Sequence, residues 1–171
     1  ITTKELAEEA CKIEIDQVGK PIGKQDQYAA AYGGIIQLDI DRLGNTTVTP
    51  IQIEEEVIYE LEHRLLMFYT KIERDANIIL GEQSTKAKNN DTVAIESMHA
   101  IKEIGFKIKR AVLEGDVDKL GNSFNEHWLE KKRISNKMSN PEIDTWYEHA
   151  LKNGALGGKI MGAGGGGFMM F

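Results

Sequence analysis

The sequence lacks the features that mark secreted and membrane proteins. It contains a single cysteine, Cys11, so no disulfide can form within the chain, and a reducing compartment is expected. No apolar run approaches the roughly 18 residues of a membrane span. The first residues, ITTKELAEEA, lack the charged start and apolar centre of a signal peptide. These absences predict a cytoplasmic location and no membrane partner.

Positive charge is also scarce. The 21 Lys and Arg residues are outnumbered by 27 Asp and Glu residues, which gives a formal net charge of -6. Acids and bases are interleaved, so no basic surface for nucleic acid or anionic lipid is predicted. The four histidines show no HExxH or similar metal-ligand spacing. Small molecules or other proteins are therefore the expected partners.

The first part of the sequence predicts a helix and a hairpin. Residues 2–18 open with a capping box, Thr2 with Glu5 three residues later, and continue at helical periodicity. The inner face is expected to carry Leu6, Ala7, Ala10, Cys11, Ile13 and Val18. The segments IIQLDI and TTVTPIQI, joined by DRLGN, predict a hairpin over residues 35–53.

The remainder predicts mostly helices. Residues 54–62 read as a short helix, followed by RLLMFYT, an apolar run short enough for a buried strand. The polar residues at 86–91 predict a break between these elements and the helices that follow. Three helical stripes follow: Ala94, Met98, Ile101, Gly105, Ile108 and Val112; then Val117, Leu120, Phe124 and Trp128; then Ile143, Trp146, Tyr147 and Ala150 after a start at Asn140-Pro141. The expected fold class is α+β.

Glu14 interrupts the amphipathic pattern of the first helix. It lies seven residues after Ala7 and four after Ala10, so its carboxylate projects from the small-residue side. An acid on that side needs a partner. A fraying helix end or a local salt bridge would explain Glu14 as well as a functional role would.

Asp26 is the only acid in the stretch IGKQDQYAAAYGG, residues 22–34. Three interpretations fit it: a cap for the helix suggested by QYAAAY, a metal ligand, or a base that takes a proton from a substrate. On local grounds alone the cap is favoured.

A glycine-rich segment, GGKIMGAGGGGFMMF, covers residues 157–171. Gly162, Gly164 and Gly167 match GxGxxG formally, but that fingerprint needs a following helix and FMMF predicts a strand. Neither Lys nor Ser/Thr follows the last glycine, which excludes a Walker A loop. A flexible linker is one interpretation, and a turn between strands, with N–H groups open to an anion, is favoured.

These segments together resemble the GHMP small-molecule kinases. The resemblance rests on Glu14, then GKQDQYAAAYGG, then LLMFYTKIER, then KIMGAGGGGFMMF, and it is strongest to the heptose 7-phosphate kinases. It implies a two-domain GHMP kinase fold. Residues 1–53 would be the C-terminal portion of an S5-like N-terminal domain, and residues 54–171 most of a ferredoxin-like C-terminal domain.

The resemblance also implies an activity. The expected reaction is ATP-dependent, Mg²⁺-requiring phosphorylation of a sugar or sugar phosphate, with the anomeric hydroxyl of D-glycero-D-manno-heptose 7-phosphate as first choice. Galactokinase-like and mevalonate-kinase-like substrates remain alternatives. A sugar-sensing protein of the same fold without catalysis is another.

Site residues follow from the same resemblance. Asp26 would be the catalytic base and Glu14 the Mg²⁺ ligand. The expected substrate-binding residues are Gln25, Gln27, Tyr28, Thr70, Lys71, Arg74, Gly162, Ala163, Gly164, Gly165 and Gly166.

The sequence departs from the family in several places. A first motif and a helix-opening glycine/serine loop, both expected upstream of Glu14, are not found. The chain is therefore expected to be an internal fragment that is inactive alone and prone to self-association. Many relatives have glycine after the Tyr-Thr pair where this chain has Lys71, which leaves the role of Lys71 open.

Overall fold

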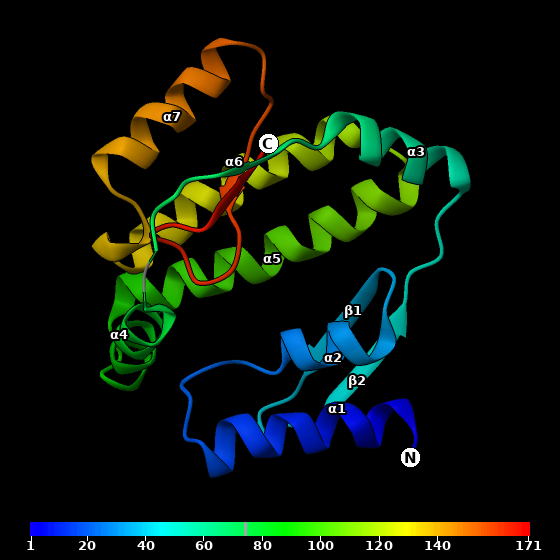
Figure 1. Ribbon diagram of the computed structural model, residues 1–171, viewed down its shortest axis with the longest axis vertical. Helices are drawn as coiled ribbons and strands as arrows, with labels where there is room; N and C mark the ends of the chain where they lie inside the picture. Colours follow the sequence, from blue (N-terminus) through cyan, green and yellow to red (C-terminus); the bar gives the residue numbers. More distant parts are fainter. Residues whose placement is uncertain (74) are drawn as a thin grey trace. The chain divides into compact units, whose positions relative to one another are not determined.

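The computed structural model describes residues 1–73 and 75–171, and the chain divides into two compact units, Ile1–Gln52 and Ile53–Phe171 (Figure 1). Both contain helices and small antiparallel sheets, which confirms the α+β prediction. Among the described residues no helix combines the length and hydropathy needed to cross a membrane.

The first unit begins with the predicted capping box. The Thr2 hydroxyl accepts from the Glu5 N–H at 3.2 Å, and the Glu5 carboxylate accepts from the Thr2 N–H at 2.7 Å. Helix α1 spans Thr3–Cys11 and runs on directly as a π-helix over Lys12–Gln17. A π-helix holds more residues per turn than an α-helix, so it rotates the side chains that follow away from the α-helical stripe.

Helix α2 and a hairpin complete this unit. Helix α2 spans Gln25–Tyr32, and strands β1 (Ile36–Ile40) and β2 (Thr46–Pro50) pair in antiparallel register. The predicted hairpin is therefore confirmed. Its turn is held by Asp41, whose carboxylate accepts from the N–H groups of Leu43 and Asn45 at 2.8 and 2.9 Å.

The core of the first unit is narrower than the sequence pattern predicts. Ala7, Cys11 and Tyr28 are buried and contact apolar side chains of the hairpin. Leu6, Ile13 and Val18, which were expected to face inward, are 54%, 45% and 61% exposed. The small α2 and hairpin cover only the strip centred on Ala7 and Cys11, so the prediction was wrong for the flanking positions.

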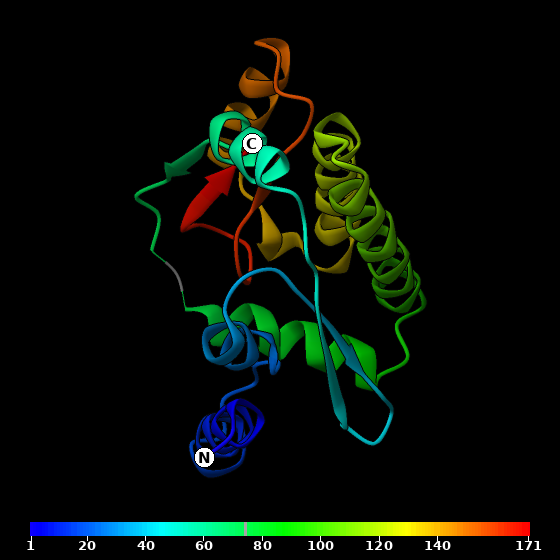
Figure 2. The same cartoon turned by 90° about the vertical axis from the view of Figure 1, so that its right-hand side faces the viewer.

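The second unit is mainly helical. Its helices are α3 (Glu55–Arg64), α4 (Ala76–Lys88), α5 (Thr92–Glu114), α6 (Val117–Ile134), a 3₁₀ turn (Asn136–Met138) and α7 (Pro141–Lys152). Helices α5 and α6 lie side by side in both views (Figures 1 and 2). Asp91 and Asn140 cap α5 and α7 by accepting from the N–H groups of Ala94 and Ile143. The three helices predicted from stripes are confirmed.

A three-stranded antiparallel sheet with the order β3-β5-β4 packs against these helices (Figure 2). Its strands are β3 (Met67–Tyr69), β4 (Lys159–Ile160) and β5 (Phe168–Met170). The main core comprises Trp128, Ile143, Tyr147, Ile160 and Met169. The glycine run thus joins two strands, as predicted.

For this unit the sequence missed one helix, and two expectations were wrong. Helix α4 was not predicted, because its sequence is weakly amphipathic and buries only Ile79. Strand β3 was expected to be buried, but its three residues are at least half exposed, because it lies at the sheet edge and pairs only with β5 among the described strands. Trp146, expected inward, is 40% exposed beside the buried Tyr147.

Candidate functional site

Asp26 lies in the first turn of α2 but does not cap it. The helix begins at Gln25, and the N-cap is Lys24, which makes no capping hydrogen bond with its side chain. The cap interpretation of Asp26 is therefore wrong. The carboxylate is exposed near the positive end of the helix, where its negative charge is favoured.

The helix that carries Asp26 is held through Glu8 of α1. The Tyr28 hydroxyl donates to Glu8, and the Lys24 ammonium lies 3.1 Å from the same carboxylate. Lys24 also donates to the Gly44 carbonyl at 3.1 Å. The bond from Tyr28 holds the pKa of Glu8 below its usual value, while burial and then Glu8 raise the pKa of Tyr28.

Glu14 lies in the π-helical segment and is already paired. Its carboxylate accepts from the Gln27 side-chain amide at 3.1 Å and from Lys20 at 3.0 Å. These two partners, Gln27 first, hold the pKa of Glu14 below its usual value, so it is ionised at neutral pH. The local salt bridge left open by the sequence is present. Within residues 1–73 and 75–171, no group of three His, Cys, Asp or Glu side chains is arranged for a metal ion.

The neighbours of Asp26 differ in accessibility. Gln25 is exposed, whereas Gln27 is 8% exposed and bonded to Glu14. Tyr28 is fully buried, with its hydroxyl on Glu8. In this structure Asp26 and Gln25 therefore present their side chains to solvent, while Gln27 and Tyr28 support the helix.

The glycine loop, residues 161–167, is held mainly by backbone groups. The Gly165 N–H donates to the Met138 carbonyl at 2.7 Å, and the Gly167 N–H donates to the Ile72 carbonyl at 3.1 Å. The Lys131 ammonium of α6 donates to the Gly162 carbonyl. These bonds use two of the N–H groups that the sequence suggested for anion binding, and they fix the loop at both ends.

The close approach of neighbouring atoms to the loop backbone explains why glycine occupies positions 164 and 166. A Cβ at Gly166 would lie 2.5 Å from the Ile72 carbonyl oxygen, which cannot move without displacing backbone. Gly164 adopts φ 103° and passes so near Met138 that a Cβ would lie 2.8 Å from its sulfur.

The segment after β3 is bonded to this loop. Thr70 is 7% exposed, and both its N–H and its hydroxyl donate to the Gly167 carbonyl, at 2.9 and 2.8 Å. Lys71 is exposed and adopts φ 57°, a left-handed conformation that is unfavourable for a residue with a Cβ. Arg74, the other predicted phosphate ligand, lies outside the described residues.

Basic side chains lie near the start of the loop. Burial first, and then the charges of Lys159 and Lys131, lower the pKa of His127 to about 3, so the imidazole is neutral at physiological pH. Burial also lowers the pKa of Lys159, whose ammonium lies 5.9 Å from the Phe124 ring centroid.

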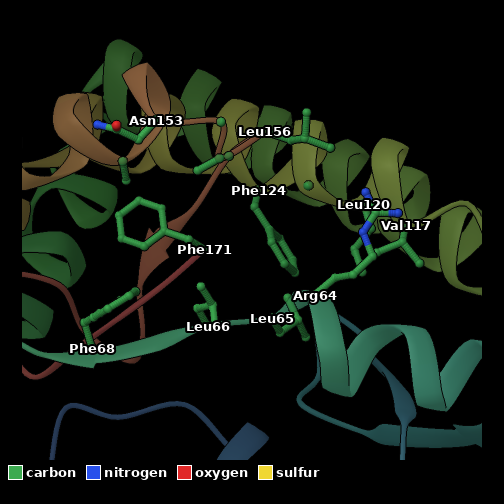
Figure 3. A pocket seen from close by; sticks show the side chains of 15 residues that line it. Arg64, Leu65, Leu66, Phe68, Val117, Leu120, Phe124, Asn153, Leu156 and Phe171 are labelled. Carbon is green, nitrogen blue, oxygen red and sulfur yellow. The ribbon is translucent and has the colours of Figure 1, made fainter.

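A cavity of about 430 Å³ opens elsewhere in the second unit, between the end of α3, α6 and the loop after α7 (Figure 3). Figure 3 shows Leu66, Phe68, Phe124 and Phe171 around it, with Arg64 and Asn153 as polar neighbours. None of the predicted site residues that the structure describes lines this cavity, and its apolar walls are unsuited to a sugar phosphate.

The structure adds residues that the sequence did not single out. Neither Glu8 nor Lys24 is among the site residues predicted from the sequence. Their partners lie 16 to 20 residues away in the chain, a separation at which no local pattern signals contact. Met138 and Ile72 support the glycine loop through their backbone carbonyl groups. Because every residue has a carbonyl group, the residue types at these positions do not indicate this role.

Comparisons with known proteins find similarity to one kinase family. Residues 108–171 match the family described as GHMP kinases C terminal. The chain is 39% identical over 167 residues to D-glycero-alpha-D-manno-heptose 7-phosphate kinase from Campylobacter jejuni, a match that covers 98% of this chain and 49% of that protein. The chain thus spans about half the length of this curated relative.

Two further proteins are similar. A galactokinase from Thermococcus kodakarensis is 30% identical over 176 residues, covering 92% of this chain and 50% of that protein. The crystal structure of a D-glycero-D-manno-heptose 1-phosphate kinase from Bacteriodes thetaiotaomicron superposes with a TM-score of 0.71 at 29% identity, covering 100% of this chain and 44% of that one.

Proposed function

The chain carries a GHMP kinase C-terminal domain, and from this premise we propose that it belongs to a cytoplasmic enzyme that phosphorylates a sugar phosphate with ATP. The preferred acceptor is the anomeric hydroxyl of D-glycero-D-manno-heptose 7-phosphate. The observation that carries the proposal is the 39% identity to a heptose 7-phosphate kinase, sustained over 98% of the chain.

Asp26 takes the acceptor proton in this proposal. The hydroxyl oxygen forms a bond to the γ-phosphorus of ATP, the bond to the bridging oxygen breaks, and its electron pair leaves on ADP. The hydroxyl proton moves to the Asp26 carboxylate. The exposure of Asp26 supports this role, because a base must reach its substrate. The exposed amide of Gln25 can bond a neighbouring sugar hydroxyl, and Gln27 and Tyr28 act by supporting the helix.

Glu14 is proposed as a ligand for Mg²⁺. Protein-bound Mg²⁺ commonly uses one or two carboxylates with substrate phosphates and water, so one ionised glutamate fits the donor set. The ion would neutralise phosphate charge. Glu14 must then exchange Lys20 for the cation, while its bond from Gln27 can persist.

The second unit is proposed to bind the anionic parts of the substrates. The loop that includes Gly162, Ala163, Gly164, Gly165 and Gly166 offers backbone dipoles without blocking side chains. Thr70 holds this loop, and the exposed Lys71, together with Arg74, recognises the phosphate already on the sugar.

The test is a coupled ADP-release assay on a full-length kinase that contains these residues, with Mg²⁺ and heptose 7-phosphate, galactose or mevalonate. We expect the highest kcat/KM with heptose 7-phosphate, and phosphorus NMR should place the new phosphate on the anomeric carbon. Preference for galactose or mevalonate would contradict the proposed substrate. Sugar binding without transfer to any acceptor would favour the sugar-sensing alternative.

The 171-residue chain alone is expected to show no turnover. It contains no helix-opening glycine/serine loop to hold the triphosphate, and phosphoryl transfer depends on that positioning. Isothermal titration with ATP and Mg²⁺ should detect weak binding or none, and sedimentation would reveal any self-association. Steady turnover by this chain would contradict the proposal that catalysis requires a triphosphate-binding loop that these 171 residues lack.

A further inference from the structure

Helix α2 lacks the usual means of fixing its own start. It has eight residues, a length at which isolated helices are unstable, and no side chain caps its first turn. The position of Asp26, in that first turn, must therefore be fixed by contacts with other elements.

Gln27 makes one such contact by donating to Glu14 at 3.1 Å, and the residues two positions before and two positions after Asp26 both contact Glu8. Lys24 lies 3.1 and 3.4 Å from the two oxygens of Glu8, and the Tyr28 hydroxyl donates to the same carboxylate. Residues four apart lie on the same side of a helix, and a residue midway between them lies on the opposite side. The buried Tyr28 and the exposed Asp26 fit this arrangement.

Lys24 also connects this helix to the hairpin. Its ammonium donates to the Gly44 carbonyl at 3.1 Å, inside a turn that the Asp41 carboxylate already closes. One side chain thus links α1, the start of α2 and the β1–β2 turn. The side chain of Lys24 is 25% exposed and that of Glu8 is 39% exposed, so solvent still screens part of this ion pair.

On the basis of the function proposed above, we propose that Glu8, Lys24 and Tyr28 are positioning residues that hold the first turn of α2 so that the Asp26 carboxylate meets the acceptor hydroxyl. None of them is required to touch the substrate. Catalysis of phosphoryl transfer is sensitive to such placement, because a misplacement of about 1 Å costs on the order of 10²-fold in rate.

The first experiment uses a full-length kinase with Tyr28→Phe, Lys24→Met and Lys24→Arg. We expect Tyr28→Phe and Lys24→Met to lower kcat about 10-fold with little change in KM for ATP, because the base is displaced while the nucleotide contacts remain. Lys24→Arg, which keeps the cation, should recover most of the loss. Lys12→Met is the matched control, since Lys12 forms an exposed pair with Glu9 at 3.9 Å and no other ion pair with the residues that the structure describes.

A second readout separates positioning from stability. The acid limb of the kcat–pH profile should move in Tyr28→Phe and Lys24→Met, since the environment of the base changes with its position. A loss of activity that follows only the folded fraction, with an unchanged pH profile, would show a structural role and overturn the proposal. Unchanged kcat in both variants would also overturn it.

Hydrogen exchange on the 171-residue chain tests the anchoring without any assay of activity. Glu8→Gln and Lys24→Met should accelerate exchange of the α2 amides, with the amides of α5 in the second unit as the internal reference. If the full-length wild type phosphorylates no acceptor, the proposed function fails, but this measurement still decides whether Glu8 holds α2. Unchanged α2 exchange in both variants would refute the anchoring itself.

Discussion

The Asp26 helix and the glycine loop are held in place by different means. Helix α2 is fixed by side chains, through the bonds from Lys24 and Tyr28 to Glu8. The glycine loop is fixed mainly by backbone groups, through the carbonyls of Met138 and Ile72, and by space too small for a Cβ.

This difference predicts different responses to change. Side-chain bonds to a carboxylate can be removed one at a time, and they weaken when the carboxylate is protonated. Backbone contacts survive most side-chain substitutions but fail when a glycine gains a methyl group. Helix α2 should therefore be sensitive to substitutions that remove a charge, and the glycine loop to substitutions that add side-chain volume.

The largest expected effect comes from Asp26→Asn in a full-length kinase. The amide keeps the shape but cannot accept the proton, so kcat should fall about 10² to 10⁴-fold. Because the side chain is exposed, thermal stability should stay near that of the wild type. Steady-state kinetics and thermal melts would measure both, and wild-type kcat in this variant would remove Asp26 from the chemistry.

The glycine loop is tested by Gly166→Ala with Gly162→Ala as its matched control. The new Cβ at position 166 would meet the Ile72 carbonyl at 2.5 Å, whereas a Cβ at position 162 meets nothing within 4 Å. We expect Gly166→Ala to lower the free energy of unfolding by about 3 kcal/mol. Gly162→Ala, which suffers only the left-handed φ of 69°, should lower it by about 1 kcal/mol. Urea titration measures both values, and equal losses would contradict the role assigned to close approach.

The pH dependence of stability should distinguish the two units. The folded pKa of His127 is about 3 against an ordinary 6.5, so the unfolded chain binds more protons and stability falls as pH drops below 6.5. Between pH 7 and pH 5 the second unit should lose about 2 kcal/mol. The lowered pKa of Glu8 acts in a lower window, where stability present above the ordinary value of 4.5 is lost as pH falls through the folded pKa.

Fluorescence can follow the His127 effect, because both tryptophans lie in the second unit. His127→Gln should flatten the loss of stability between pH 7 and pH 5. His99→Gln, at an exposed position on α5, should leave it unchanged. If the free energy of unfolding falls equally with pH in the wild type and both variants, His127 does not control the loss of stability between pH 7 and pH 5.

The smallest expected effect is that of Thr70→Val. The substitution removes two hydroxyl bonds, the one donated to the Gly167 carbonyl and the one accepted from the Ile72 N–H, but keeps the bond from the residue 70 N–H. Unfolding should therefore become easier by about 1 kcal/mol. Thr85→Val provides a control, since the Thr85 hydroxyl bonds only the Gly81 carbonyl within the exposed part of α4. Equal effects in denaturant titrations would show that Thr70 contributes nothing special to the loop.

The sequence predicted elements whose cause is local. The Thr2–Glu5 capping box and the Asn140 cap depend on residues three apart, and the stripes of α5 and α6 on their own periodicity. Helix α4 was missed because a weakly amphipathic helix gives no period to detect. The π-helix at Lys12–Gln17 was missed because its side-chain pattern differs little from that of an α-helix over six residues.

For the candidate site too, the sequence indicated what depends on local pattern and missed what depends on contacts between distant residues. Asp26, Glu14 and the glycine loop stand out in the sequence because their spacing resembles a family. The contact of Glu8 with Tyr28 spans 20 residues, and nothing near either residue signals it. The burial of Tyr28 and Thr70, two residues expected to bind substrate, likewise depends on tertiary packing.

The left-handed backbone at Lys71 has an evolutionary consequence. Glycine adopts φ 57° without strain, so replacing Lys71 with glycine should stabilise the fold while removing a cation. In a library of variants at position 71 that is selected only for thermal stability, glycine should therefore become enriched. If Lys71 binds the substrate phosphate as proposed, a library selected for kinase activity should keep lysine or arginine, and the divergence of the two populations would report the selective value of that single charge.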